Sequence, residues 1–256
     1  MNILFTICGR EGSKGFKNKN LKKMNGIPLV YYTFSVIRLY KDCHNEDSVI
    51  TALNTDSQRL KGLASNQHIL EDIIFVNRKM ELAGDTVPKV DVIRDTYESV
   101  RSFGEFDVIV DLDITSPMRR LVDVENVIQI YQDNLEYDLV FSVVEARRSP
   151  YFNMVERKSD GNYRKICESI FTARQQAPIC YELNASIYAY RPKFLKNNMK
   201  QTILDYNCGI SIMPDYLVLD IDSEKDFEMM QFLHTHYCEV DSDLRNIYKI
   251  AGDGGF

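Results

Sequence analysis

The chain has 256 residues, of which 45% are hydrophobic, so it is long enough for one large domain or two small ones with a sizeable core. Its net charge of −6, from 31 basic and 37 acidic residues, argues against a nucleic-acid partner, because proteins that bind duplexes usually carry a basic excess. No stretch is apolar enough to span a bilayer, the N-terminus lacks the pattern of a secretion signal, and the six Cys residues lack CxxC spacing. We therefore expect a cytoplasmic protein with reduced thiols and no membrane partner.

Apolar runs of strand type alternate with amphipathic segments along the first part of the chain. The strands predicted there are residues 2–8, 47–54, 73–77, 106–114 and 138–144. The helices predicted there are residues 28–41, 57–66, 89–103 and 122–135. This alternation of strand and helix predicts an α/β fold with a mostly parallel sheet between layers of helices.

The alternation breaks at residue 145, where the sequence becomes polar, aromatic and irregular. It resumes with strands predicted at residues 184–190, 208–213 and 216–222 and helices at 192–198 and 224–237. The interruption indicates an excursion from the sheet, which is either an arm that makes a subunit contact or a surface loop. We therefore expect residues 1–256 to form a single domain into which residues 145–183 are inserted.

A basic, glycine-rich segment, residues 8–26, follows the first predicted strand and is called the basic loop below. In sheets of this kind, ligands bind beyond the carboxyl ends of the strands. Glycines let backbone N–H groups approach phosphate oxygens, and Lys and Arg side chains neutralise them. The spacing fits neither the P-loop nor the dinucleotide fingerprint, so charge alone leaves open a phosphate cradle or a solvated loop. The residues suited to a cradle are Arg10, Gly12, Ser13, Lys14, Gly15, Lys17, Lys19 and Asn20.

Two pairs of Asp residues alternate with apolar residues in predicted strands. Asp220 and Asp222 would share one face of a strand at about 7 Å, near enough to share one Mg²⁺, which prefers oxygen ligands. From the spacing alone, an ordinary half-exposed strand explains this pair better than a metal site. Asp111 and Asp113 repeat the spacing, and Asp111 is equally well explained as a buried structural residue.

Six segments, in order, resemble motifs of the CMP-sialic acid synthetases, the acylneuraminate cytidylyltransferases. They are GREGSKGFKNKNLKKMNG (9–26), NTD (54–56), RKMELAGDT (78–86), LDITSPMR (112–119), ARQQAPICYELNASIYAY (173–190) and LDIDSEKDF (219–227). Several stretches resemble more particularly the branch that activates legionaminic acid, a bacterial relative of sialic acid. These are TIC, DLDITSPMR, ARRSPYFNMVE and TARQQAPICYELNASIY.

The resemblance implies a three-layer, Rossmann-like nucleotidyltransferase fold in which residues 145–183 form a dimerisation arm of a homodimer. It implies an enzyme that joins CMP from CTP to the anomeric hydroxyl of a nine-carbon 2-keto sugar acid and releases pyrophosphate, with Mg²⁺ or Mn²⁺ as cofactor. Such a product would serve cell-surface glycan synthesis or flagellin glycosylation. The alternatives are a CMP-Kdo-type or sugar-1-phosphate nucleotidyltransferase of the same fold, and a non-catalytic anion-binding subunit. Both aspartates and the basic loop disfavour the last.

The resemblance also assigns nucleotide-binding roles. It places the triphosphate among Arg10, Gly12, Ser13, Lys14, Lys19 and Asn20. Arg10 and Lys19 are also expected to take part in catalysis. The cytosine falls to residues 78–86: Arg78 can donate to its O2 and N3, and the Ala83 carbonyl can accept from its amino group, with Asp85 orienting the loop. The alternative for Arg78 is a surface ion pair.

The remaining roles concern the metal and the sugar. The resemblance makes Asp220 and Asp222 the metal ligands, and Asp222 could also accept the proton of the attacking hydroxyl. Its sugar-binding positions are Asp113, Arg119, Arg174, Gln175 and Asn184. We expect Arg174 to pair with the sugar carboxylate. Asp113 stands where sialate synthetases carry Gln, so its partner is in doubt, and a pocket less basic than theirs agrees with legionaminic acid.

Overall fold

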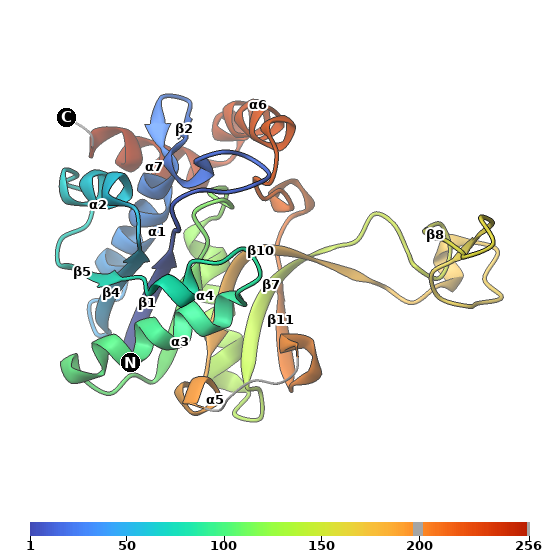
Figure 1. Cartoon of the computed structure of the whole chain (residues 1–256), viewed down its shortest axis with the longest axis horizontal. Helices are drawn as coiled ribbons and strands as arrows, with labels where there is room; N and C mark the ends of the chain where they lie inside the picture. The colour runs from blue at the N-terminus through green and yellow to red at the C-terminus, as the bar shows by residue number, and fades with distance from the viewer. Residues whose placement is uncertain (197–201, 255–256) are drawn as a thin grey trace.

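The computed structural model describes residues 1–196 and 202–254, and its centre is a seven-stranded sheet (Figure 1). The strand order is β11-β7-β10-β6-β1-β4-β5. The strands are β1 (Asn2–Cys8), β4 (Ser48–Thr55), β5 (Ile73–Asn77), β6 (Val108–Leu112), β7 (Leu139–Glu145), β10 (Tyr181–Tyr190) and β11 (Cys208–Ile212). β10 is antiparallel to both of its neighbours, and the other neighbouring pairs are parallel, so the expected mostly parallel sheet is confirmed.

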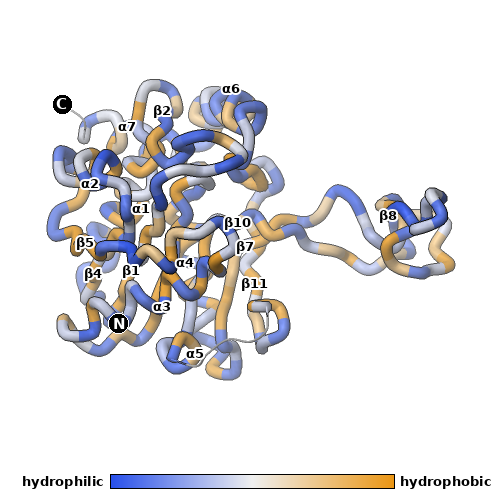
Figure 2. Tube along the Cα trace, viewed as in Figure 1, coloured by the Kyte–Doolittle hydropathy of each residue, from blue (hydrophilic) through white to orange (hydrophobic). Residues whose placement is uncertain are grey.

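Helices cover both faces of this sheet. The helices are α1 (Leu29–Cys43), α2 (Gln58–Ser65), α3 (Lys89–Val100), α4 (Leu121–Asp133), α5 (Pro192–Lys196), α6 (Glu224–Val240) and α7 (Ser242–Asp253). Strand β1 shows how the sequence serves two layers: Ile3 and Phe5 pack in one core with α1 and α4, whereas Leu4 packs in a second core with α3 and α5. Figure 2 shows the tube through the central strands as mainly hydrophobic. The α/β class expected from the sequence is confirmed.

Two short hairpins stand outside the central sheet: β2 (Lys23–Met24) with β3 (Ile27–Pro28), and β8 (Val155–Arg157) with β9 (Tyr163–Lys165). The second hairpin belongs to the segment between β7 and β10, which projects far from the sheet in Figure 1. We call this segment, residues 146–180, the arm. Its exposed apolar side chains include Val155, Tyr163, Ile166, Ile170 and Ile179.

The strand predicted at residues 216–222 is wrong. Asp215–Leu217 form a 3₁₀ turn, and the chain then runs as an irregular loop into α6. A strand needs a neighbour that pairs with it along its length, and here the Ile221 N–H donates only to the Thr115 carbonyl of another loop. The sequence also gave no warning of α7, and residues 197 and 198 of the helix predicted at 192–198 lie outside the described residues.

Within the described residues, no helix combines the length and the apolar character that crossing a bilayer would require.

Candidate active site

A pocket lies at the carboxyl ends of the parallel strands, where the strand order reverses beside β1. After β5 the chain returns to place β6 on the opposite side of β1 from β4, which is the arrangement that opens a crevice for ligands. Three loops line it: the basic loop after β1, residues 78–87 after β5, and the loop after β6. We call it the edge pocket. Its lining includes Arg10, Lys19, Asn20, Arg78, Gly84, Asp85, Lys89, Asp113 and Thr115.

The basic loop and the loop after β5 are joined by Asp85. Its carboxylate lies 2.5 Å from Arg10 Nη2 and 2.7 Å from Lys14 Nζ. Hydrogen bonds from Lys14 and Arg10 lower the pKa of Asp85 below its ordinary value. Arg10 Nη1 also lies 3.5 Å from the carbonyl oxygen of Ala83. The structure therefore brings together residues that the sequence assigned to the triphosphate and residues that it assigned to the base.

Other residues of the basic loop shape its backbone. Asn20 is almost buried, and its Nδ2 donates to the Arg10 carbonyl over 3.1 Å. The Ser13 hydroxyl donates to the Phe16 carbonyl and accepts from the Lys19 N–H over 3.4 Å. Gly12 has a φ of 73°, a left-handed conformation that favours glycine. These bonds hold the loop in a tight turn, and Arg10 and Lys19 are the two cations of the loop that line the pocket.

The acidic loop, residues 218–223, reaches the basic loop through Lys19. Lys19 Nζ lies 2.8 Å from Asp222 Oδ1 and 2.9 Å from the Ile221 carbonyl oxygen. Asp220 is half-buried, and no side-chain hydrogen bond or ion pair of its carboxylate is found within residues 1–196 and 202–254. Burial, and then repulsion by Asp222 and Asp113, raises the pKa of Asp220 above its ordinary value.

This acidic loop fits a divalent cation in one respect and is incomplete in another. A partly buried carboxylate that repels its acidic neighbours is stabilised by a cation, and oxygen ligands suit Mg²⁺. No group of three or more metal-ligating side chains is present among the described residues, so further ligands would have to come from phosphate oxygens and water.

Arg78 is oriented by the end of the neighbouring strand β4. Its Nε donates to Asn54 Oδ1 over 3.0 Å, and its Nη2 donates to the Asn54 carbonyl over 3.2 Å. No carboxylate within ion-pair distance of Arg78 is found in the described part of the chain, which argues against the alternative of a surface ion pair. Asn54 is fully buried and was not identified as a site residue from the sequence, where it was part of the NTD motif only.

Lys89 is the main residue of the edge pocket that sequence reasoning missed. Its ammonium lies 2.7 Å from Asp111 Oδ2 and 2.6 Å from Asp113 Oδ2, which identifies the unknown partner of Asp113. Burial opposes the charge, but Asp111 and Asp113 raise the pKa of Lys89 well above its ordinary value. Lys89 is the first residue of α3, where the helix dipole disfavours a cation. A lysine at this unfavourable position of a predicted helix was the one feature of the sequence that could have identified Lys89 as a residue of the pocket.

Arg119 and Asn184 were predicted to contact the sugar, and the structure corrects this. Each residue is only 1% exposed. The turn after Asp113 folds Arg119 inward, where its Nε donates to the Ser116 carbonyl over 3.1 Å and its Nη2 to the carbonyls of Asp113 and Ser116. Burial lowers the pKa of Arg119 to about 10. Asn184 Oδ1 accepts from a Ser hydroxyl over 2.6 Å inside the core. Both side chains are therefore bonded inside the fold, and neither lines the edge pocket.

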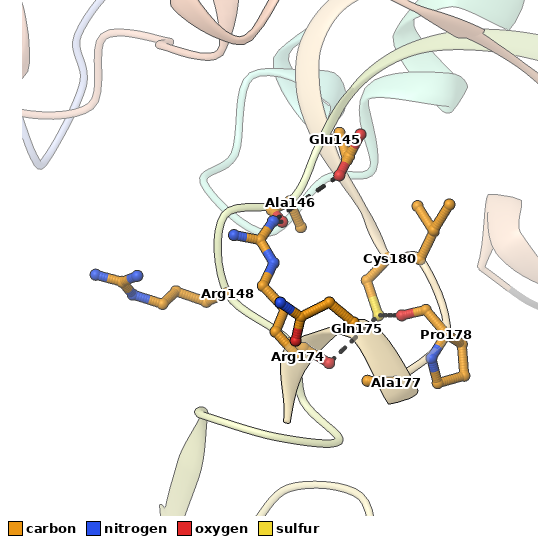
Figure 3. Close-up of a pocket in the computed structure, with 10 residues that line it drawn as sticks. Glu145, Ala146, Arg148, Arg174, Gln175, Ala177, Pro178 and Cys180 are labelled. Atoms are coloured by element: carbon orange, nitrogen blue, oxygen red, sulfur yellow. Dashed lines mark hydrogen bonds and ion pairs between the residues drawn. The ribbon is translucent and has the colours of Figure 1, made fainter. Parts of the chain in front are cut away.

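The other two predicted sugar residues lie in a second cavity, at the base of the arm (Figure 3). Arg174 Nη2 donates to the Ala146 carbonyl over 3.2 Å and lies 3.8 Å from Glu145 Oε1. Gln175 lines the same cavity, which we call the arm pocket. Since β7 ends and β10 begins at the edge that holds the edge pocket, the arm leaves the sheet from the functional edge. Within one chain, however, Arg174 and Gln175 are not part of the edge-pocket lining.

Comparison with known sequences agrees with the geometry. A family model described as "Cytidylyltransferase" matches residues 4–236. The chain is 36% identical over 233 residues to the "Post-translational flagellin modification protein B" of Campylobacter coli, covering 90% of this chain and 94% of that protein. Identity and coverage are the same for the "CMP-N,N'-diacetyllegionaminic acid synthase" of Campylobacter jejuni. An "N-acylneuraminate cytidylyltransferase" of Streptococcus agalactiae is 24% identical, over 97% of this chain and 57% of that one.

Comparison with solved structures supports the fold. The structure of a CMP:2-keto-3-deoxy-manno-octonic acid synthetase complexed with CTP superimposes with a TM-score of 0.65 at 16% identity. The match covers 93% of this chain and 100% of that one.

Proposed function

Because the chain belongs to the cytidylyltransferase family, we propose that it transfers CMP from CTP to the anomeric hydroxyl of a nonulosonic acid and releases pyrophosphate. The observation that carries this proposal is the edge pocket, where Arg10 and Lys19 of the basic loop face Arg78 and its loop across one cavity. A polyphosphate and an attached base would each find complementary groups there. The resemblance to the legionaminic acid branch and the two relatives at 36% identity favour legionaminic acid or a close relative as the acceptor.

The basic loop is suited to the leaving pyrophosphate and the reacting phosphorus. Arg10, Lys14 and Lys19 would neutralise the charge that develops on phosphate oxygens during transfer. Arg10 and Lys14 now hold the Asp85 carboxylate, so the triphosphate must take over these contacts when it binds. Backbone N–H groups near Gly12 would approach the same oxygens.

The acidic loop would hold Mg²⁺ or Mn²⁺ through Asp220 and Asp222. When bound, such an ion supplies positive charge to the phosphate oxygens and completes its ligand set with them. Asp222 is also the candidate acceptor for the proton of the attacking hydroxyl. Its Oδ1 binds Lys19, and no partner of its Oδ2 is found among the residues that the structure describes.

Arg78 and Ala83 are suited to distinguish cytosine from uracil. Asn54 uses the Nε and Nη2 groups of Arg78 and leaves Nη1 to donate to cytosine O2 or N3. Uracil carries N3–H and would leave a donor without an acceptor, while the Ala83 carbonyl would lose the amino group that it accepts from.

We propose that the arm pairs two copies of the chain and that Arg174 then meets the sugar carboxylate. The arm exposes Ile170, with 94% of its surface accessible, and Tyr163, with 68%, far from the core of its own chain. Apolar side chains exposed in this number on one projection are typical of an interface. Ile170→Asp should convert a dimer into a monomer in sedimentation analysis, whereas Phe103→Asp, which changes an exposed residue outside the arm, should not. If the wild type sediments as a monomer, the proposed pairing of two chains through the arm is refuted.

The proposed setting is the cytoplasm, with a product that serves cell-surface glycan synthesis or flagellin glycosylation. All six cysteines are unpaired, as a reducing compartment requires.

Pyrophosphate release tests the function directly. Each reaction contains the enzyme, Mg²⁺, one nucleotide (CTP, UTP or GTP) and one acceptor. The acceptors tested are a panel of nonulosonic acids and Kdo. We expect pyrophosphate to be released with CTP but not with UTP or GTP. Among the acceptors, legionaminic acid should give the highest kcat/KM. Faster turnover of N-acetylneuraminic acid would overturn the finer assignment, a preference for Kdo would favour the eight-carbon alternative, and no release with any acceptor would refute the function.

A further inference from the structure

Lys89 places a further cationic donor, with no role assigned so far, at the edge pocket beside Arg10, Lys19 and Arg78. Its ammonium carries three N–H groups; one of them donates to Asp113 Oδ2 over 2.6 Å, and the ammonium also forms an ion pair with Asp111 Oδ2 at 2.7 Å. Its side chain is 34% exposed, and it lines the pocket beside Arg78 and Asp113. One N–H of the ammonium is therefore left for a molecule in the pocket.

The two carboxylates are held firmly by other groups, which fixes the position of the ammonium between them. Asp111 is fully buried, and its Oδ1 accepts from the Thr6 hydroxyl over 2.8 Å. Asp113 Oδ1 accepts from both the N–H and the hydroxyl of Thr115, over 2.9 and 2.8 Å. A carboxylate so occupied has little capacity left for a ligand, so Lys89 rather than Asp113 is the group able to bind one.

The charges around Lys89 indicate which kind of acceptor it would take. Asp111 and Asp113 offset the charges of Lys89 and of Arg119, whose guanidinium donates to the Asp113 carbonyl. The cluster as a whole is close to neutral. An anion gains little there, whereas a neutral oxygen gains a charge-assisted hydrogen bond from the ammonium.

Resting on the function proposed above, we propose that Lys89 contacts the sugar acid and determines which one is accepted. It donates to a neutral oxygen of that substrate, either a hydroxyl or the carbonyl of an acylamino group. The phosphates have their cations in the basic loop, and the base has Arg78 and the Ala83 carbonyl. The part of the pocket beside Lys89 and Thr115 is the part that remains for the second substrate.

The test separates the KM for the sugar acid from the KM for CTP. Lys89→Met removes the donor but leaves the buried Asp111 and the partly buried Asp113 without their cation, which can impair folding. Lys89→Met/Asp113→Asn therefore serves as a second variant that leaves less uncompensated charge. In both variants we expect the KM for the sugar acid to rise tenfold or more, with the KM for CTP changed less than twofold. Lys249→Met, on the exposed face of α7, controls for the loss of a lysine and should match the wild type.

A series of acceptors, each lacking one hydroxyl or acyl group, then identifies the partner atom. The wild type should lose activity with the analogue that lacks the oxygen bound by Lys89, and the double variant should show no further loss with that analogue. An unchanged KM for the sugar acid, or a rise confined to the KM for CTP, in a variant whose melting curve shows that it folds would overturn the inference. If the wild type itself releases no pyrophosphate with any nonulosonic acid, the proposed function fails first and this inference fails with it.

Discussion

The ammonium of Lys19 lies 2.8 Å from Asp222 Oδ1, although 203 positions separate the two residues in the chain. This ion pair joins the basic loop after β1 to the acidic loop before α6. It places the groups suited to phosphate next to those suited to a divalent cation, which is the arrangement that nucleotidyl transfer requires.

The approach of these two loops depends on Gly15. A Cβ at position 15 would lie 2.6 Å from the backbone oxygen of Asp222, so Gly15→Ala must push the loops apart. We expect kcat/KM to fall at least about tenfold, because small displacements of catalytic groups are costly. Gly62→Ala is the control: its Cβ meets nothing within 4 Å, and it should stabilise α2 by about 0.5–1 kcal/mol at full activity. Equal kinetics of the two variants would contradict the role of Gly15.

Arg10 is the cation of the basic loop that most directly faces the loop after β5. Arg10→Ala removes a charge-assisted donor, which is worth about 1.5–3 kcal/mol, so we expect CTP affinity to fall about 10- to 100-fold. Calorimetric titration with CTP and the rate of pyrophosphate release measure the effect. Arg59→Ala changes an exposed arginine on α2 and should leave both unchanged. A variant at position 10 with normal affinity and rate would refute the triphosphate cradle.

Asp220 is the acidic-loop residue best suited to hold a cation, since its carboxylate is half-buried and repelled by its acidic neighbours. We expect Asp220→Asn to fold normally, to lose about 100-fold or more in turnover, and to need a higher Mg²⁺ concentration for half-maximal rate. A titration of the rate with Mg²⁺ measures this. Asp243→Asn, on the exposed first turn of α7, should leave the titration unchanged. Normal turnover at low Mg²⁺ would show that Asp220 is not a ligand.

The same residue predicts a pH dependence of stability in the metal-free protein. Burial, with Asp222 and Asp113 nearby, raises the pKa of Asp220 above its ordinary value of 3.8, so the folded state binds a proton more tightly than the unfolded state. The contribution of Asp220 to the free energy of unfolding is therefore lost as the pH rises from about 3.8 through the folded-state pKa.

In the variant Asp220→Asn the side chain at this position cannot ionise. The loss of stability with rising pH that Asp220 causes should therefore be absent. We expect its metal-free form to melt at a higher temperature than the wild type at neutral pH, and the difference to shrink towards pH 4. Thermal melts in chelator across this range provide the measurement. A melting temperature below that of the wild type at neutral pH would contradict the assigned direction.

Local patterns were sufficient to predict most of the fold. Apolar runs predicted β1 at residues 2–8 and β5 at residues 73–77, with the same bounds as in the structure. The segment at 216–222 failed because Asp220 and Asp222 alternate with apolar residues in a loop that no strand pairs with along its length. Hydrophobic periodicity predicts a strand only where a partner strand is present, and in this loop only Leu217 and Ile221 are buried.

The candidate site could be predicted only where chemistry is local. Arg10 and Lys19 belong to one contiguous motif and Arg78 and Asp85 to another, and the structure places these four residues in one pocket. Arg119 and Asn184 looked equally available but are buried, because nothing in a motif records the direction in which a side chain points.

By itself, the sequence determined the strand–helix alternation, the basic segment at the end of the first strand and the pattern of motifs shared with the cytidylyltransferases, because hydrophobic periodicity and motif spacing are properties of neighbouring residues. Only the tertiary structure decided that Lys19 meets Asp222, that Asn54 orients Arg78 and that Lys89 lies between Asp111 and Asp113. Each of these contacts joins side chains from separate loops, strands or helices, and their distances are set by how the sheet and helices pack rather than by any local preference of the chain.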